Sequence, residues 1–454
     1  MASQAKKMNM LQGSLWDKIL IVALPFALTG MMQQFFNALD IAMLGQFVGK
    51  EAMAAVGSNS SVLATTLSLF IGISLGANVV IASFIGKKDT AGIHKGVHTA
   101  ILVALLCGIS MTVVGEVITN QLLDFLSVPL EIRSMAEMYL RIYFLGLPVI
   151  FLYNFESAIF RSQGDTRTPL YCLIAGGIIK AFLNLFFILQ LGMSAEGVAI
   201  GTIVANTISS GLLFYFLRRS KTEIRVRMHE FAIDKPLLVQ ILKIGLPAGL
   251  QNMVFSLSNL CIQSAINSLG PDVMAASAAA FNIEIFTYFI INAFGQVCTT
   301  FTSQNYGARL LSRCKRVFKL CLAMDSIVAV AGGVLTIVFA DQLLRLFNSD
   351  AAVISIGYVR LFYIQAFCLV EVVLEIVSGA MRGYGNSLIP AVITLFGICG
   401  TRVTWVYTVF ANHPTFDCLM TVFPLSWFVT SIILSAAYIW FLRHLPTWET
   451  AKQQ

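Results

Sequence analysis

Charged residues are scarce in this chain. Of its 454 residues, 12% are charged and 57% are hydrophobic, and the mean hydropathy is +0.80. Soluble domains usually carry about 25% charged residues. The low charge content therefore excludes a soluble globular protein and predicts an integral membrane protein.

The sequence also lacks the short motifs of common enzyme, nucleotide and metal sites. It has no HExxH motif, no P-loop and no dinucleotide-binding fingerprint. Its nine cysteines stand singly, almost all within apolar runs, which indicates neither a disulfide framework nor a zinc site. We expect no catalytic residue, no resident metal and no cofactor, and nothing indicates ATP-driven pumping by this chain alone.

Long apolar runs fill the chain instead. A bilayer core about 30 Å thick needs roughly 20 apolar residues per helix, whereas barrel strands would appear as short alternating segments. The runs predict an all-α integral membrane protein with twelve transmembrane helices, the first of them retained because no signal-peptide cleavage site precedes it. The approximate bounds are 19–44, 55–84, 97–118, 138–160, 169–191, 197–217, 241–267, 275–300, 317–340, 358–380, 389–410 and 420–442.

Basic residues gather in alternate connections between these runs. Those after the second, fourth, sixth, eighth and tenth runs hold most of the lysines and arginines, and the opposite set has little beyond Lys50, Arg133 and Arg345. The positive-inside rule places the basic set, and both termini, in the cytoplasm. We expect a multi-pass protein of a cell membrane, and a bacterial inner membrane fits the short loops. We therefore attribute the net charge of +7 to orientation of the protein in the membrane and to contact with anionic lipid, and not to binding of nucleic acid.

The two halves of the sequence repeat each other. "SAIFRSQGDTRTP" (157–169) matches "SGAMRGYGNSLIP" (378–390) at a constant offset, since 378−157 and 390−169 both equal 221. Six spans per half give both halves the same orientation, a plan typical of transporters whose two bundles surround a central cavity. The predicted division is a six-helix bundle at 1–217, a cytoplasmic connection at 218–240 and a second six-helix bundle at 241–454.

Asp40 stands near the end of the first apolar run, in "FFNALDIAMLG" (35–45). A charge at the centre of a span costs about 2.5–3.5 kcal/mol. One interpretation is a helix-end carboxylate that snorkels or pairs near the interface. The other is a cavity-facing carboxylate that carries a proton, because burial disfavours its charged form. Asn37 and Asn184 are possible hydrogen-bond partners and Lys180 a possible counter-charge, although spacing leaves open whether Lys180 reaches Asp40.

Two glutamates of the tenth run share one helix face. Glu371 and Glu375 are four residues apart, so they repel unless they are protonated, paired or bound to a cation. An ion pair with Arg402 and the binding of a cation are both open interpretations, and Glu284 in the eighth run could join either. Asp325 in the ninth run has no evident partner.

The chain resembles the multidrug and toxic compound extrusion (MATE) family. The segments that resemble the family are spread over both halves of the chain; they are Leu24–Gly57, Phe160–Pro169, Ala181–Thr202 and Met381–Pro390. It implies secondary antiport, in which amphipathic and often cationic organic compounds are exported in exchange for H⁺ or Na⁺. It also implies two bundles that alternate between outward and inward openings, with multidrug efflux as the activity.

The resemblance assigns roles to particular residues. Asp40 matches the first-helix carboxylate that members use for ion coupling, and Glu371 matches an acidic tenth-helix position that some use for cations. Of an amino-terminal sodium site known in some members only Thr202 is retained, because Lys180 replaces an amide and Asn184 a carboxylate. A lysine ammonium would repel Na⁺, which favours protons in the first bundle and leaves a cation site near Glu371 open.

Several functions remain as alternatives at this stage. The runner-up is a lipid-linked precursor flippase of the wider superfamily, which should present several arginines to its cavity; a membrane enzyme and a non-transporting receptor fit less well. We expect small organic cations and membrane lipids as partners and a monomer as the working form. The candidate ion-coupling residues are Asp40, Asn37, Lys180, Asn184 and Thr202, and the candidate substrate- or cation-binding residues are Glu284, Glu371, Glu375 and Arg402.

Overall fold

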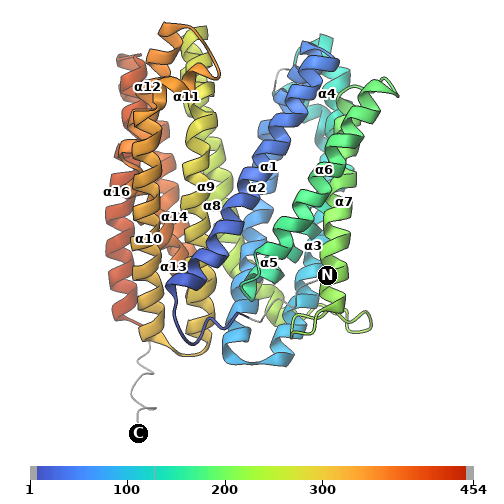
Figure 1. The fold of residues 1–454 in the computed structure, drawn as a ribbon, viewed down its shortest axis with the longest axis vertical. Helices are drawn as coiled ribbons and strands as arrows, with labels where there is room; N and C mark the ends of the chain where they lie inside the picture. The colour runs from blue at the N-terminus through green and yellow to red at the C-terminus, as the bar shows by residue number, and fades with distance from the viewer. Residues whose placement is uncertain (1–7, 127, 446–454) are drawn as a thin grey trace. The chain divides into compact units, whose positions relative to one another are not determined.

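Helices make up almost all of the protein (Figure 1). The computed structural model describes residues 8–126 and 128–445, and no strand occurs among them. The first helices are α1 (Trp16–Phe47), α2 (Lys50–Lys87), α3 (Thr90–Phe125), α4 (Leu130–Leu145), α5 (Leu147–Ser162), α6 (Arg167–Leu189) and α7 (Ala195–Arg219). They are followed by α8 (Lys235–Ser268), α9 (Pro271–Gly307), α10 (Leu311–Val338), α11 (Ala340–Arg345), α12 (Ala351–Ala366), α13 (Cys368–Gly383), α14 (Leu388–Thr394), the π-helix η1 (Leu395–Gly400), α15 (Thr401–Trp405), the π-helix η2 (Val406–Phe410) and α16 (Phe416–Arg443).

The number of helices that can cross a membrane agrees with the predicted fold. Ten are long and apolar enough by themselves, the segment from α14 to η2 counting as one of them. Two further spans are bent pairs, α4 with α5 at 48° and α12 with α13 at 46°. With each pair taken as one span the described residues contain twelve, so the prediction of an all-α membrane protein is confirmed.

The two bends occupy the same place in the repeat. The first pair breaks at Gly146 and the second at Phe367, and 367−146 equals 221, the offset of the repeated sequence motif. Pro148 in the first turn of α5 cannot donate a backbone hydrogen bond, which weakens the helix there. The second pair bends without a proline at this place. The repeat therefore extends from the sequence motif to the shape of the backbone.

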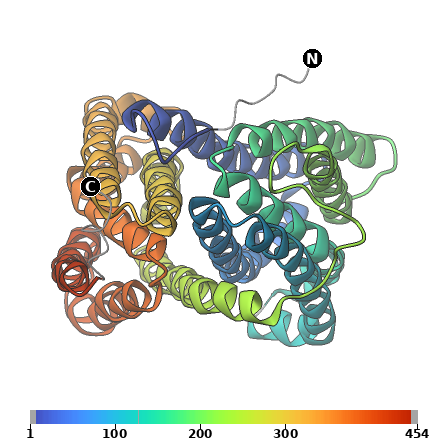
Figure 2. The ribbon, with the colours of Figure 1, turned by 90° about the horizontal axis from the view of Figure 1, so that it is seen from below.

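The described residues form two compact units. The first contains residue 8 and residues 28–246, and the second contains residues 9–27 and 247–445. Seen from below, the helices of each unit form their own bundle (Figure 2). The boundaries therefore fall within α1 and α8, close to Pro25 and Pro247, whereas the predicted division fell in the connection 218–240. A sequence repeat cannot show that a helix is divided between two units. It shows which helices correspond to each other, but not which helices the two ends of one helix contact.

Close approach of helices in the first unit depends on small residues. α6 lies along α7, and α3 lies along α5. A Cβ atom at Gly176 would overlap the hydroxyl oxygen of Ser209, and one at Gly108 would overlap Pro148. Small residues at such crossings let two backbones approach within a membrane. This close contact fixes the side chains of α6 relative to the rest of the unit.

In the second unit, α9 contacts α10, α12 and α13. A Cβ atom at Gly379 would overlap the carbonyl oxygen of Gly295, so α9 and α13 touch through their backbones. Ala280, Leu344 and Leu361 belong to an apolar cluster at one end of these helices. The arrangement places the acidic residues of α13 beside α9 and α10, within the interior of the unit.

Candidate functional site

Asp40 of α1 is bound by two side chains of α6. The Lys180 ammonium donates to Asp40 Oδ2 at 2.5 Å, and the Asn184 amide donates to Asp40 Oδ1 at 2.8 Å. Asp40 is 8% exposed, Lys180 7% and Asn184 0%. Lys180 and Asn184 are one helical turn apart and so present both donors to the same carboxylate. The question that spacing left open is settled, because Lys180 reaches Asp40.

Two glycines make room for this group, which we call the Asp40 site (Asp40, Lys180 and Asn184). A Cβ atom at Gly177 on α6 would overlap the ring of Phe36 on α1, and one at Gly201 on α7 would overlap Asn184 Oδ1. Because glycine has no side chain, α1 and α7 can approach α6 closely at these two crossings. The site is therefore enclosed by three helices of the first unit.

The other two candidate residues of the first unit do not bind Asp40. Thr202 is buried beside the site on α7, but its hydroxyl donates to the Val198 carbonyl oxygen of its own helix at 2.9 Å. Asn37 lies one turn before Asp40 on α1, is exposed, and makes no hydrogen bond to a described residue. The expected hydrogen bond from Asn37 to Asp40 is therefore absent, and the described donors to this carboxylate are Lys180 and Asn184.

Two tyrosines of α4 complete the electrostatic surroundings of Asp40. Tyr139 and Tyr143 are both within electrostatic reach of its carboxylate, and their ring centroids are 6.1 Å apart. Sequence analysis missed them. Their i,i+4 spacing in the fourth apolar run was a signal, but nothing in the sequence linked that run to the first.

The Asp40 site can couple the protonation of one carboxylate to the contact between two helices. Removing one partner of a buried ion pair costs about 3–5 kcal/mol, because an uncompensated charge is left behind. A proton on Asp40 has the same electrostatic effect, since it leaves Lys180 without its anion. Gain or loss of a proton is therefore linked to the strength with which α1 holds α6.

Glu284 of α9 pairs with Arg360 of α12, a residue that sequence analysis did not select. Arg360 Nη2 donates to Glu284 Oε1 at 2.5 Å and Arg360 Nε donates to Oε2 at 3.1 Å, while Nη1 donates to the Ser277 hydroxyl at 2.6 Å. Both charged side chains are buried. Glu284 therefore belongs to a bidentate ion pair and joins neither of the expected arrangements. The signal was the presence of Arg360 inside the tenth run.

Arg402 of α15 lies in an aromatic and polar environment. It is 1% exposed, and its Nη1 donates to Asn259 Oδ1 at 2.8 Å. Its guanidinium carbon is 4.5 Å from the ring centroid of Phe423 and 5.1 Å from that of Phe255, which is cation–π geometry. No ion pair joins Arg402 to a glutamate among the described residues. The expected ion pair with Glu371 and Glu375 is therefore absent.

Glu371 and Glu375 of α13 have few partners. Glu375 Oε2 lies 4.0 Å from Arg382 Nη1 and accepts no hydrogen bond, and no bond or ion pair to Glu371 occurs within the described part of the chain. Of the two interpretations, cation binding stays a prediction. In the part of the chain that the structure describes, no group of three or more histidine, cysteine or acidic side chains is arranged to hold a metal ion.

The repeat relates Arg402 to Lys180. Both 402−180 and 259−37 equal 222, the offset that also separates Pro25 from Pro247. In each unit a buried basic residue thus reaches from one helix of the repeat to a polar side chain of another, Asp40 in the first unit and Asn259 in the second. In the second unit the acceptor is a neutral amide at the place equivalent to Asn37. Of these two repeat-related basic residues, only Lys180 donates to an ionisable side chain among the described residues.

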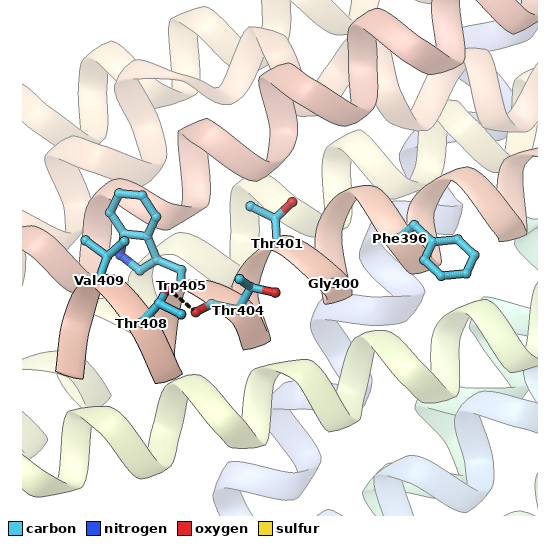
Figure 3. A pocket seen from close by; sticks show the side chains of 7 residues that line it. All are labelled: Phe396, Gly400, Thr401, Thr404, Trp405, Thr408 and Val409. Carbon is cyan, nitrogen blue, oxygen red and sulfur yellow. Dashed lines mark hydrogen bonds between the residues drawn. The ribbon is translucent and has the colours of Figure 1, made fainter. Parts of the chain in front are cut away.

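A hollow of about 460 Å³ lies on the segment from η1 to η2 (Figure 3). It is lined by Phe396, Gly400, Thr401, Thr404, Trp405, Thr408 and Val409. The Thr408 hydroxyl donates to the Thr404 carbonyl oxygen at 2.6 Å, and so belongs to the helix itself. None of the candidate site residues lines this hollow, although Arg402 directly follows the lining residue Thr401 on α15.

The family of the chain follows from a comparison with known proteins. The MatE family model matches residues 25–186 and again residues 247–408. The starts and the ends of the two matches are both 222 residues apart, within one residue of the 221 that separates the repeated motifs and the bends, so the family model finds the same repeat. The chain belongs to the MatE family. MatE proteins are transporters and not enzymes, and the chain is accordingly a multi-pass membrane transporter.

Relatives of this MatE protein match along most of its length. Over 403 residues it is 28% identical to "Probable multidrug resistance protein YoeA" of Bacillus subtilis, with 86% of each chain covered. It is 26% identical to "Probable multidrug resistance protein NorM" of Thermotoga maritima, with 85% of this chain and 84% of the relative covered.

Solved structures share the fold. One is described as the outward-facing conformation of a multidrug resistance MATE family transporter; it is 21% identical, with a TM-score of 0.89 over 97% of this chain and 99% of that one. Another, a transporter of Pyrococcus furiosus whose binding pocket is described as having reversed polarity, gives a TM-score of 0.87 at 21% identity over 97% and 98%. These likenesses confirm the MATE-type fold.

Proposed function

We propose that this MatE transporter exports amphipathic organic cations from the cell in exchange for protons. The observation that carries the proposal is the buried ion pair of Asp40 and Lys180, a titratable carboxylate within a span of a transporter. Relatives named as multidrug resistance proteins support organic compounds as the substrates. The acidic residues Glu371 and Glu375 favour substrates with a positive charge.

Protonation of Asp40 can change the balance between two conformational states of the transporter. An ion changes the balance between two states only when it binds them with different affinity. A state in which Lys180 contacts Asp40 disfavours the proton, because the ammonium stabilises the carboxylate. A state in which α1 and α6 separate at this point favours it. The same ammonium repels Na⁺ from the first unit, so we propose H⁺ and keep Na⁺ as an outcome of the test.

Location and assembly complete the proposal. The alternation of basic connections supports a cell membrane with both termini in the cytoplasm, and the bacterial relatives fit a bacterial inner membrane. We propose a monomer whose two units alternate between openings to the two sides of the membrane.

The test is gradient-driven uptake of a fluorescent organic cation into inside-out vesicles that contain the purified protein. An imposed pH gradient is compared with an imposed Na⁺ gradient, in the wild type and in Asp40→Asn. Asp124→Asn is the matched control, because Asp124 lies at an exposed end of α3 and its one ion pair within residues 8–126 and 128–445 is with Arg133 at 2.6 Å. We expect proton-driven uptake in the wild type and the control and none in Asp40→Asn. Full uptake in Asp40→Asn would exclude the coupling role, and uptake driven by Na⁺ alone would exclude the proton.

A second candidate function is transport of an anionic lipid-linked precursor. Arg402 favours it, because this buried guanidinium has no carboxylate partner among the described residues. Against it, Arg360 is neutralised by Glu284. Movement of a fluorescent anionic lipid across the same vesicles, together with no accumulation of the organic cation under either gradient, would favour this candidate over the first.

A further inference from the structure

The connection between α7 and α8 lies folded against the first unit. This segment of residues 220–234, which we call the strap, contains no helix or strand. Ile224 and Val226 of the strap are both 1% exposed, and the Val226 amide donates to the Leu217 carbonyl oxygen of α7 at 3.3 Å. A loose linker would have few buried apolar contacts. The strap is therefore a folded part of the first unit.

His98 of α3 binds the middle of the strap. It is 1% exposed, and its Nδ1 lies 2.7 Å from the His94 carbonyl oxygen. Because a carbonyl oxygen only accepts, Nδ1 carries a hydrogen. In the neutral ring Nε2 then accepts, and the Arg227 amide donates to it at 3.1 Å. Phe231 of the strap packs edge-on against the imidazole, with 5.1 Å between the ring centroids. The docked strap therefore requires the neutral Nδ1–H form of His98.

A proton on His98 Nε2 is incompatible with this contact. The Arg227 amide would then face another N–H group and lose its acceptor. The new N–H could donate to the Arg227 carbonyl oxygen, also 3.1 Å away, but that oxygen already accepts from the Glu230 amide at 3.1 Å. A buried donor without an acceptor costs free energy, and so does a buried charge without a counter-ion. Protonation of His98 therefore weakens the docking of the strap.

The charged groups of the strap pair with one another and not with the imidazole. Lys95 Nζ of α3 lies 3.2 Å from Asp234 Oδ2, and Arg227 Nη1 lies 2.8 Å from Glu230 Oε1. The hydrogen bond from Arg227 holds the pKa of the Glu230 carboxyl below its usual range, so Glu230 stays ionised while a histidine titrates. In the described part of the chain no carboxylate is bonded to His98.

The other titratable groups near His98 are basic. The ring centroid of His94 is 6.5 Å from that of His98, and His229 Nε2 lies 3.7 Å from a Glu230 oxygen with its side chain 82% exposed. α2 and α5 both contact α3 and have Lys87 and Arg161 in their last turns. None of these side chains supplies a counter-ion for a charged imidazole.

The strap leads directly into α8 and fixes the start of this helix. The Asp234 amide donates to the Thr99 hydroxyl of α3 at 3.1 Å. The Asp234 carboxylate accepts from the Leu237 amide at 3.2 Å, which caps the first turn of α8. The same helix continues beyond Pro247 into the second unit. A docked strap therefore anchors a helix that both units share.

The repeat provides an internal comparison for the strap. α1 and α10 correspond to α8 and α3, and the segment before α1 is held on α10 by Arg313, whose Nε donates to the Met10 carbonyl oxygen at 3.1 Å and whose Nη2 donates to that of Gly13 at 3.0 Å. A guanidinium is not deprotonated in proteins, so this contact does not change with pH. The place equivalent to His98 is Lys319, because 319−98 is 221. Of these two docked segments, only the strap is bound by a histidine side chain within residues 8–126 and 128–445.

We propose that His98 is a pH sensor on the cytoplasmic side, and that its protonation releases the strap and slows transport. Histidine ordinarily changes charge between about pH 5 and 8. The proton reaches the ring when the strap opens, so acid shifts the balance towards the open strap. The start of α8 then loses its anchor, and less of the movement of one unit is passed to the other. This inference goes beyond the proposed exchange and does not depend on the coupling ion.

Hydrogen exchange of the strap, followed by mass spectrometry, tests the sensor in the purified full-length protein. The wild type is compared at about pH 7.5 and about pH 5.5, near the two ends of the range in which histidine titrates. After correction for the chemical effect of pH, exchange should be faster at the lower pH, by up to about tenfold per pH unit, which is the limit for one proton. In His98→Gln the corrected exchange should be equal at the two pH values.

The controls for hydrogen exchange are the two neighbouring histidines. His94→Gln keeps the backbone carbonyl that binds His98, and His229→Gln changes an exposed side chain; both variants should keep the pH dependence. Thr99→Val should loosen the strap and still keep the pH dependence, which separates titration from weak docking. A pH dependence that survives in His98→Gln, or that is missing from the wild type, would overturn the proposal.

Nitrogen NMR of histidine-labelled protein gives a second test that does not depend on the opening of the strap. The His98 signal is assigned by its absence from His98→Gln. At about pH 7.5, above the range in which histidine ordinarily titrates, it should show a neutral ring with hydrogen on Nδ1. A charged ring, or hydrogen on Nε2 alone, would reject the sensor.

Uptake at a constant pH difference across the membrane tests the effect on transport. In inside-out vesicles the strap faces the external buffer. Lowering the pH on both sides together should slow the wild type more than His98→Gln, because only the wild type can release the strap by protonation of His98. Equal slowing of the two proteins would reject the regulatory role.

Discussion

Lys180 and Asp40 are 140 positions apart in the sequence and form a buried ion pair with 2.5 Å between Nζ and Oδ2. The pair joins α6 to α1 within a single unit, and both residues are less than 10% exposed. An ion pair so placed has two separable roles, since it holds two helices together and it offers a carboxylate that can be protonated. The two roles predict different outcomes for single and double variants.

The first prediction separates stability from transport at this pair. Asp40→Asn leaves a buried ammonium and Lys180→Met leaves a buried carboxylate, so each should lower stability by about 3–5 kcal/mol. The double variant removes both charges and should recover most of the loss. Thermal unfolding in detergent measures the stability of each variant, and vesicle uptake measures its transport. Uptake should remain absent in the double variant, because the carboxylate is missing; recovery of uptake along with stability would show that the pair is only structural.

The second prediction concerns the space beside Asn184. Gly201→Ala should push the Asn184 amide away from Asp40, because the new Cβ atom would overlap its oxygen. Overpacking of this kind costs about 1–3 kcal/mol, and proton-driven uptake should fall with it. Gly211→Ala is the matched control on the same helix, since a Cβ atom there meets nothing within 4 Å. Equal uptake by the two variants would mean that the position of Asn184 does not matter for transport.

The third prediction compares a buried ion pair with an exposed one in the second unit. Glu284→Gln removes the carboxylate that binds Arg360 and leaves a buried guanidinium, so the free energy of unfolding should fall by about 3–5 kcal/mol. Asp341→Asn breaks the pair with Arg345, whose side chains are 55% and 59% exposed, and should cause no measurable change. Thermal unfolding of both variants beside the wild type is the measurement. Similar unfolding temperatures for the two would show that the Glu284 pair is not structural.

Much of the fold could be predicted from the sequence because it follows from local composition. The apolar runs gave twelve spans, and the repeated motif around Pro169 and Pro390 gave two related halves. The division of α1 and α8 between the two units, close to Pro25 and Pro247, could not be predicted. It depends on which helices the two ends of each of these helices contact. Such contacts leave no periodic signal in a single sequence.

The candidate site was predicted only in part, for a similar reason. An intramembrane charge is costly, so sequence alone could select Asp40, Lys180 and Arg402 as residues that need partners. Assigning the partners requires the rotation of each helix about its axis. Arg402 illustrates the difficulty, because an ion pair with Glu371 and Glu375 was one of two open interpretations, whereas in the structure Arg402 contacts an amide and two aromatic rings.

The last prediction uses the relation between the repeats. Asn259→Asp would give Arg402 a carboxylate partner in place of an amide, as Lys180 has in the first unit. Hydrogen bonds to charged groups contribute about 1.5–3 kcal/mol, against about 0.5–1.5 kcal/mol for neutral ones, so the variant should raise the unfolding temperature. Asn267→Asp changes an exposed amide of the same helix, whose side-chain oxygen accepts a hydrogen bond from Gln263, and should leave the unfolding temperature unchanged. A lower unfolding temperature for Asn259→Asp would mean that desolvation of the new carboxylate outweighs its pairing, and that a neutral acceptor is what Arg402 requires.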